Sequence, residues 1–250
     1  MHAVQRLYLH RKSLSTTTFK ARGQRVMRCE QCRIAVEYCI CDLSPNVTSN
    51  AAFLLLMYDT EILKPSNTGR LIADVIPDTF AFLWSRTQEN TELLNVINDP
   101  QWQPFVVFPE QYAEPEREVF KESLPLQEGK RPLFIMLDGS WREAKKMFRK
   151  SPYLNKFPVV AFDPEKVGDE QLASRYQIRN ANVENQFATA EVAARMLAMI
   201  DENTNANVLD LWFDVFSFQY QKSKCRGNKG NPLAIENYTQ YIEQQPIPKK

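Results

Sequence analysis

The sequence predicts an α/β fold in which a mostly parallel sheet is flanked by helices. From residue 51 onward, apolar runs about the length of buried strands alternate with helical patterns. This alternation is typical of parallel sheets, because the crossover between two parallel strands is usually a helix. With 250 residues and 44% hydrophobic content, the chain can bury a large core. We expect one large domain with appendages, or one domain and a small module.

The expected elements follow in chain order. Five apolar runs are the expected strands, at residues 53–58, 80–84, 105–108, 133–137 and 159–162. Apolar residues at helical spacing lie between and after them, at residues 71–76, 93–97, 144–148, 193–200 and 208–216. The last two stripes are explained more simply by core packing than by ligand binding. Thr189 could cap the helix that carries the fourth stripe.

The ends of the chain predict appendages to the main domain. Residues 1–21 read as a flexible basic arm, because residues 13–18 are almost wholly polar. Residues 22–48 form a cysteine-rich segment that resembles a zinc ribbon, and residues 49–221 form the α/β domain. Residues 222–250 begin with a basic stretch that breaks the helical period, which predicts a basic tail.

The composition is that of an ordinary globular protein. No apolar run approaches the roughly 20 residues of a spanning helix, and the N-terminus lacks a secretory signal. We therefore expect no membrane association and a cytoplasmic location. Thirty-one Lys and Arg against 30 Asp and Glu give a net charge of +1. The charge is segregated, however, with basic residues before Arg33 and from Arg142 to Lys156, and acidic ones from Glu110 to Glu128, so a polyanionic partner stays possible.

An aspartate stands at the end of the fourth expected strand. Asp138 follows an apolar run and precedes Gly139, while Ser140 and Glu143 have the spacing of a capping box at a helix N-terminus. Ligands of open α/β sheets bind beyond the carboxyl ends of the strands. This favours a functional position for Asp138, although a turn-forming Asp-Gly pair explains the residues about as well.

Four of the five cysteines form a compact cluster. They are Cys29, Cys32, Cys39 and Cys41. Disulfides are improbable in a cytoplasmic protein, and four thiolates can complete a tetrahedral zinc site that would present nearby arginines from a rigid knob. The Cys-x-Cys half departs from the usual ribbon spacing, so partly buried thiols without a metal are an equal alternative.

Several stretches resemble one family, in that family's order. Residues 137–141, Leu-Asp-Gly-Ser-Trp, resemble the Asp-x-Thr-Trp motif of DTW-domain proteins. The cysteine cluster is similar to the family's N-terminal cluster, residues 61–71 to its Asn-Thr-Gly-Arg motif, and residues 175–179 and 188–193 to its late motifs. Ser140 stands where Thr is usual and keeps the hydroxyl. Ala188 stands where Ser is common, which removes one possible cofactor hydrogen bond.

The resemblance implies a tRNA-modifying enzyme. Members similar to this chain are tRNA-uridine aminocarboxypropyltransferases, related to the SPOUT class of knotted S-adenosylmethionine enzymes. A SPOUT-like fold with a trefoil knot near the C-terminal half of the sheet is therefore implied. S-adenosylmethionine would donate its 3-amino-3-carboxypropyl group to N3 of a tRNA uridine. A SPOUT-type RNA methyltransferase is the strongest alternative, and a non-catalytic zinc-dependent RNA-binding module is another. The target uridine and the oligomeric state stay open.

The resemblance also assigns expected roles to residues of the donor site. Asp138 would be catalytic, either as the base that accepts the N3 proton or as an electrostatic stabiliser. Arg179 could grip the transferred carboxylate or form a structural salt bridge, and core packing explains Tyr176 at least as well. The full set of expected donor-binding residues is Tyr176, Ile178, Arg179, Ala188, Thr189 and Glu191.

RNA binding is expected from the basic elements and from two of the motifs. The residues are Arg22, Arg25, Arg28, Asn67, Arg70, Trp141, Arg142, Lys145 and Arg149. Arg142, Lys145 and Arg149 share one helical face at a spacing that can track phosphates. Trp141 could stack on a base, although core burial is the favoured interpretation, and helix capping explains Asn67 equally well.

Overall fold

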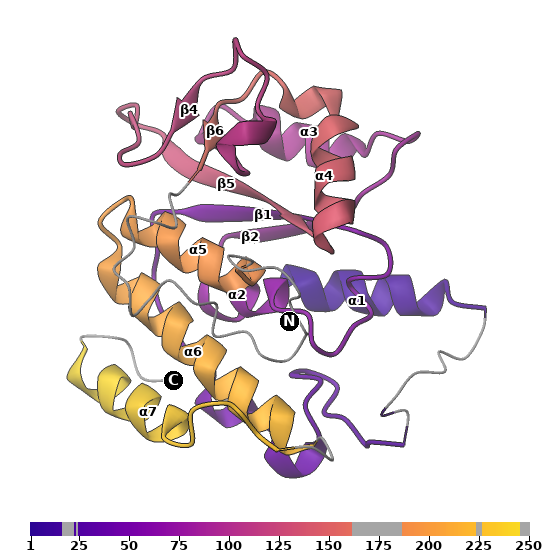
Figure 1. Cartoon of the computed structure of the whole chain (residues 1–250), viewed down its shortest axis with the longest axis vertical. Coiled ribbons are helices and arrows are strands. Elements are labelled where there is room, and N and C mark those ends of the chain that lie inside the picture. The colour runs from indigo at the N-terminus through magenta and orange to yellow at the C-terminus, as the bar shows by residue number, and fades with distance from the viewer. Residues whose placement is uncertain (17–22, 24, 162–186, 224–226, 246–250) are drawn as a thin grey trace.

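A computed structural model describes residues 1–16, 23, 25–161, 187–223 and 227–245, which form a parallel sheet between two layers of helices (Figure 1). The strands are β1 Ala52–Met57, β2 Thr79–Leu83, β3 Trp102–Val107, β4 Val119–Phe120, β5 Arg131–Asp138 and β6 Val159–Val160. The α-helices are α1 Ala3–Ser13, α2 Gly69–Val75, α3 Thr91–Asn98, α4 Trp141–Arg149, α5 Thr189–Ala198, α6 Asn203–Lys222 and α7 Ala234–Gln244. Short 3₁₀ helices are η1 Val36–Tyr38, η2 Cys41–Leu43, η3 Glu110–Tyr112 and η4 Pro152–Leu154.

The strands pair in the order β2-β1-β5-β3-β6-β4, and every described pair is parallel. The central strand β5 pairs with both β1 and β3, and Ile135 lies opposite Leu54 on one side and Val106 on the other. All six residues of β1 are buried. A strand covered on both faces has no solvent side, which explains its uninterrupted apolar sequence. The predicted α/β class with a parallel sheet is confirmed.

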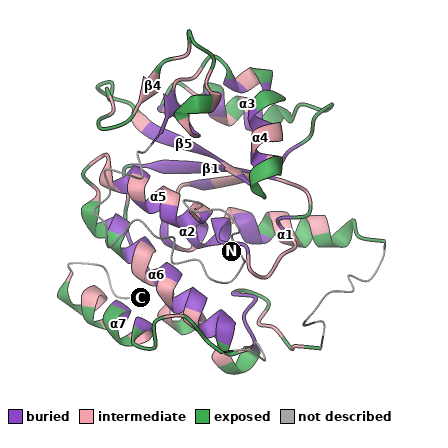
Figure 2. Cartoon of the chain, viewed as in Figure 1, coloured by how far each residue is buried: buried purple, intermediate pink, exposed green. Residues whose placement is uncertain are grey.

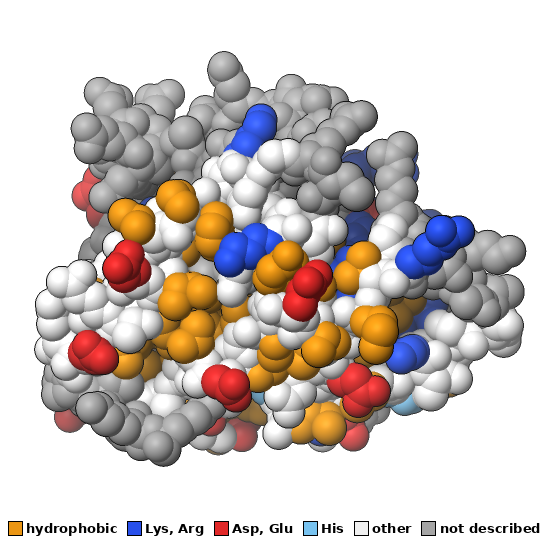
Figure 3. All heavy atoms as spheres, turned by 90° about the horizontal axis from the view of Figure 1, so that it is seen from below, with side chains coloured by type: hydrophobic (Ala, Val, Ile, Leu, Met, Phe, Trp, Pro, Cys, Tyr) orange, Lys and Arg blue, Asp and Glu red, His pale blue; other side chains and the backbone are white. Residues whose placement is uncertain are grey.

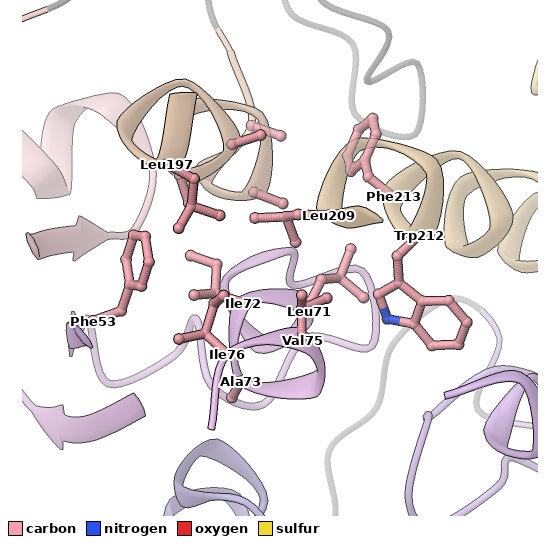
Figure 4. Packing of buried hydrophobic residues seen from close by; sticks show 14 of the residues in the cluster. Phe53, Leu71, Ile72, Ala73, Val75, Ile76, Leu197, Leu209, Trp212 and Phe213 are labelled. Atoms are coloured by element: carbon pink, nitrogen blue, oxygen red, sulfur yellow. The ribbon is translucent and has the colours of Figure 1, made fainter. Parts of the chain in front are cut away.

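The sheet separates two hydrophobic cores. Phe53 and Leu55 of β1 belong to the core shared with α2, α5 and α6, whereas Leu54 and Leu56 belong to the core shared with α3 and α4. This division follows from the two-residue period of a strand. Buried residues accordingly form a continuous band through the sheet and the inner faces of the helices (Figure 2). Figure 4 shows the layer below the sheet, where side chains of α2 pack against those of α5 and α6.

The chain leaves β1 and β5 toward opposite faces of the sheet. After β1 it continues into α2 below the sheet, and after β5 it continues into α4 above it (Figure 1). The carboxyl ends of these strands are adjacent, with Met57 opposite Asp138. Neighbouring parallel strands with connections on opposite faces leave a crevice at their carboxyl ends, which is where α/β proteins bind ligands. Asp138 occupies this position.

The expected flexible arm is wrong for Ala3–Ser13, which form α1. Val4 is fully buried in the lower core, and the Arg11 guanidinium pairs with the Asp59 carboxylate at 2.5 Å. His2 lies before the helix, and its Nε2 is 3.2 Å from Oδ1 of Asp74. Polar contacts with distant segments thus hold a helix whose own sequence has little apolar periodicity.

The expected boundaries of the cysteine-rich segment and the tail also change. Ile34 and Ile40 belong to the same hydrophobic core as β1, so the segment packs on the main domain. The tail contains α7, whose Tyr238 is buried, donates its hydroxyl to the Leu43 carbonyl at 2.8 Å and packs against Trp212 of α6. Within the residues described, no helix has both the length and the apolar character needed to cross a bilayer.

Candidate functional site

The carboxylate of Asp138 is enclosed at the end of β5, where only 2% of the residue is exposed. The side-chain amide of Asn67 donates to Oδ2 at 2.6 Å, and the hydroxyl of Thr189 donates to Oδ1 at 2.6 Å. These donors stand 71 residues before and 51 residues after Asp138 in the chain. Three of the segments singled out in the sequence are therefore joined by direct hydrogen bonds.

Gly69 allows the start of α2 to approach this carboxylate. A β-carbon at this position would lie 2.7 Å from Oδ2 and 2.9 Å from Cγ of Asp138. Such distances are shorter than van der Waals contact, so any larger residue would displace the carboxylate or the helix. Glycine is required here for the close approach of backbone to side chain.

A second carboxylate extends the network away from Asp138. Oε1 of Glu61 accepts from the Asn67 amide at 3.3 Å, and Oε2 pairs with the Lys64 amine at 2.6 Å. The Asn67 side-chain oxygen accepts from the backbone N–H of Arg70 at 3.1 Å. The oxygen of the Asn67 amide thus accepts from the first turn of α2, and its nitrogen donates to two carboxylates. These contacts fix the orientation of the amide. Sequence reasoning did not identify Glu61 and Lys64, although both lie in the Asn-Thr-Gly-Arg stretch.

The start of α5 differs from expectation. Thr189 is the first helical residue, with Ala188 at the cap position, and its hydroxyl donates to Asp138. The backbone N–H of Ala188 donates to the Glu191 carboxylate at 2.7 Å, and both residues are buried. Glu191 therefore satisfies the helix start in place of a hydroxyl cap. Tyr176, Ile178 and Arg179 lie outside the described residues.

The four clustered cysteines bring their sulfurs together. All four Sγ atoms lie within 4.8 Å of one another, with Cys29 to Cys41 at 3.6 Å and Cys32 to Cys39 at 3.7 Å. A tetrahedral zinc ion with Zn–S bonds of about 2.3 Å separates its sulfurs by roughly 3.8 Å. The donor set and the spacing therefore fit one structural ion.

The thiols of the cluster have shifted pKa values. Burial alone would raise the pKa of the Cys29 thiol, but hydrogen bonds from the Cys32 and Gln31 backbones lower this pKa to about 7. Burial raises the pKa of the Cys32 thiol to about 11. Because thiolates are the metal-binding form, loading a metal would release protons, including the one held by the buried Cys32 thiol.

The match to a known protein family spans the segments that meet at Asp138 and the cysteine cluster. The DTW domain matches residues 26–221, which contain the cysteine cluster, Asp138 and the start of α5. The chain belongs to the DTW domain family. A curated relative of this DTW domain, tRNA-uridine aminocarboxypropyltransferase 2 of Drosophila melanogaster, is 21% identical over 181 residues. That alignment covers 70% of this chain and 66% of the relative, just under two thirds of its length. No solved structure gave a significant match.

Two expected RNA contacts of the DTW domain are buried. Arg70 is 1% exposed, donates to the Cys32 carbonyl and pairs with Asp74, with Nη2 3.0 Å from Oδ2. Asn67 is fully buried between Asp138 and Glu61. These partners enclose both side chains, so the expectation that they contact RNA is corrected, and their contacts lie within the protein.

The remaining expected RNA contacts in this part of the chain lie on α4. They are Trp141, Arg142, Lys145 and Arg149. Trp141 is 37% exposed, which corrects the favoured interpretation of core burial. Its ring stacks on Phe108, with centroids 5.6 Å apart, and the Lys145 amine lies 5.6 Å from the ring centroids of both Trp141 and Tyr112. Arg142 and Arg149 are exposed. The result is a half-open aromatic surface with cations around it.

Lys146, the next residue of α4, forms a second cation–aromatic group, which was not identified from the sequence. The Lys146 amine lies 5.8 Å from the Tyr58 ring and 5.5 Å from the Trp84 ring, and these rings stack on each other. Tyr58 follows β1, and its backbone N–H donates to the Asp138 carbonyl at 2.9 Å. In the sequence, this group is indicated by an aromatic residue directly after each of two apolar strands, Tyr58 after β1 and Trp84 after β2.

The other basic candidates lie in the cysteine-rich segment. Arg25 is exposed, whereas Arg28 is half-buried, donates to the Arg33 carbonyl at 3.1 Å and lies over the Tyr220 ring. Arg22 lies outside the described residues. On the lower face of the molecule, hydrophobic side chains are interspersed with separate acidic ones (Figure 3). Among the described residues in that view, the basic side chains do not merge into one patch.

Proposed function

We propose that this DTW domain is a tRNA-modifying transferase that moves the 3-amino-3-carboxypropyl group of S-adenosylmethionine to N3 of a tRNA uridine. The observation that carries the proposal is the position of Asp138. Its carboxylate lies in the crevice between β1 and β5 and is held by donors from two distant motifs. The name of the fly relative supports the same substrate class and reaction.

The proposed reaction must remove a proton from N3 of the uridine. N3 of the uridine forms a bond to the carbon beside the sulfonium, the carbon–sulfur bond breaks, and methylthioadenosine leaves. The N3 proton must also leave. We assign its acceptance, or the orientation of the ring, to Asp138, whose carboxylate is held in one direction by Asn67 and Thr189 before substrate arrives.

The donor substrate is assigned to the late motifs. Ala188, Thr189 and Glu191 begin α5, and an N-terminal helix turn offers backbone N–H groups and a favourable field for a carboxylate. Arg179 is assigned to the transferred carboxylate, and Tyr176 and Ile178 to the pocket wall, as expectations from sequence. A SPOUT-like fold with a trefoil knot also stays a prediction, since residues 162–186 lie outside the described part of the chain.

RNA is assigned to the exposed face of α4. Trp141, whose ring is supported by Phe108 and Tyr112, offers a part-exposed ring on which an unpaired base can stack, and Lys145 supplies a cation at its edge. Arg142 and Arg149 are placed to contact phosphates, together with Arg25 and Arg28 in the cysteine-rich segment. The cysteine cluster is assigned to a structural zinc ion, which would stabilise this segment.

The deciding experiment uses unmodified bulk tRNA and S-adenosylmethionine labelled in the aminocarboxypropyl carbons. We expect label in the tRNA and release of methylthioadenosine. Transfer of a methyl label with S-adenosylhomocysteine as by-product would establish the methyltransferase instead. Binding of tRNA without transfer of either label would favour the non-catalytic module.

The variant Asp138→Asn tests the carboxylate. It keeps the shape of the side chain and removes its charge, so turnover should fall by about 10²–10⁴-fold while tRNA affinity is retained. Asp201→Asn is the matched control, because Asp201 is exposed and its φ of 62° suits asparagine. Wild-type turnover in Asp138→Asn would remove Asp138 from the reaction.

A further inference from the structure

Arg33 occupies a backbone conformation that favours glycine. It follows Cys32 in the tight turn of the cysteine cluster, where its φ is 59°. The turn is closed by hydrogen bonds from the Arg33 N–H to the Cys29 carbonyl at 2.9 Å and from the Cys29 N–H to the Ile34 carbonyl at 2.8 Å. A left-handed conformation costs a residue with a β-carbon about 1 kcal/mol or more relative to glycine. The large side chain at this position therefore needs an explanation.

The Arg33 side chain is buried with few partners. The residue is 3% exposed, its Nη1 donates to the Ile62 carbonyl at 2.6 Å, and the guanidinium lies 4.3 Å from the centroid of the Tyr8 ring. Within the described part of the chain, Nε and Nη2 have no hydrogen-bond partner and no carboxylate forms an ion pair with the group. Burying a charge in this way opposes folding. Core packing alone would be served better by an apolar residue.

The Ile62 carbonyl places Arg33 on the loop that holds Asp138. Ile62 directly follows Glu61, whose carboxylate accepts from Asn67, and Asn67 donates to Asp138. A second link runs the other way, because Arg70 at the end of this loop donates to the Cys32 carbonyl. Two arginines thus connect the cysteine turn to both ends of the segment from Glu61 to Arg70.

We propose that Arg33 is a positioning residue, which locks the Glu61–Arg70 loop to the cysteine turn and so couples metal binding at the four cysteines to the orientation of Asp138. A metal held by the four cysteines would fix the turn and with it the Arg33 backbone, and the guanidinium holds the loop through the Ile62 carbonyl. The effect on transfer rests on the proposed function. The effect on the loop itself does not.

The test measures amide hydrogen exchange of residues 61–70 by mass spectrometry, with zinc bound and after chelation. Arg33→Gly removes the guanidinium and suits the left-handed backbone, so the turn and one zinc per chain should be retained. Exchange of the loop should rise about 10- to 100-fold, the size of one hydrogen bond to a charged group. Arg33→Lys keeps a donor and a charge, and should recover part of the protection. Glu37→Ala, an exposed change in the same segment, should leave exchange unchanged.

Chelation completes the test of coupling. It should raise loop exchange in the wild type and add less in Arg33→Gly, where the Arg33 link is already broken and only the Arg70 link to the Cys32 carbonyl remains. Turnover of Arg33→Gly should fall with little change in the KM for tRNA. Loop exchange that is unchanged in Arg33→Gly, or that rises equally throughout the molecule, would overturn the proposal. If the wild type transfers no label while exchange shows the coupling, the proposed function fails and the positioning role stands.

Discussion

At the scale of single residues, Gly69 shows how closely the protein encloses the Asp138 carboxylate. Gly69→Ala would place a methyl group 2.7 Å from Oδ2, so the carboxylate must move. We expect turnover to fall about 10²-fold, because small displacements of reacting groups are costly, and stability to fall by about 1–3 kcal/mol. Gly227→Ala is the control, since a β-carbon there meets nothing within 4 Å. Labelled transfer and thermal unfolding measure both effects, and full turnover in Gly69→Ala would show that the carboxylate position is not critical.

The carboxylate of Asp74 is predicted to make the stability of the fold depend on pH. Burial would raise its pKa, but Arg70 and His2 lower it to about 2, and the Trp212 indole also donates to it. A depressed pKa stabilises the fold above the unfolded value of about 3.9, and this contribution disappears as pH falls toward 2.

Asp74→Asn tests this contribution. It should destabilise the protein by about 3 kcal/mol at pH 7, because Arg70 would lose its buried partner. Urea unfolding at several pH values checks the prediction: the difference between the two proteins should shrink between about pH 5 and 2. A difference independent of pH would show that the ion pair does not cause the loss.

The residues near Asp138 also show what the sequence could not predict. The end of an apolar run before Gly139 was enough to place Asp138 at a strand end. Asn67 and Arg70 were expected to contact RNA as part of a polar loop that lines the site. Their burial depends on partners at Glu61, Asp74 and Cys32, which no local pattern identifies.

At the scale of elements, α4 is predicted to be the main RNA-binding helix. Replacing both Arg142 and Arg149 by alanine should weaken tRNA binding and reduce the slope of log affinity against log salt by roughly 2, about 1 for each lost phosphate contact. Binding measured at several salt concentrations checks this. The exposed pair Lys121 and Lys130, near the acidic stretch, gives the control double variant with an unchanged slope. An equal loss in both double variants would mean that only net charge matters.

Among the elements, each of the five predicted apolar runs falls on a strand, and β1 shows the reason most clearly, because a strand whose six residues are all buried has no polar position. Strand β4 was missed, since Val119–Phe120 is only two residues long and lies in an acidic stretch. Helix α1 was missed for another reason. Its attachment relies on Val4, on the contact of His2 with Asp74 and on the ion pair of Arg11 with Asp59.

At the scale of the whole molecule, the cysteine cluster links the N-terminal segment to the main core. We expect one zinc per chain, and chelation should lower the midpoint of thermal unfolding, because the ion binds only the folded arrangement. Cys32→Ser should cause a similar loss, and Asp42→Ala, an exposed neighbour of Cys41, should not. Metal analysis and calorimetry measure both. An unfolding midpoint that does not respond to chelation would favour thiols without a metal.

The position of β5 between β1 and β3 determines the order in which the chain can fold during synthesis. Both neighbours precede β5 in sequence, so on the ribosome β1 can pair with β2 but cannot be joined to β3 until residue 138 has emerged. Thr189 follows 51 residues later. Parallel pairings between distant segments form slowly and leave strand edges exposed meanwhile. A nascent chain that stops before α5 therefore has the six strands of the described residues and lacks the second donor of Asp138, so the site is completed only after this sheet.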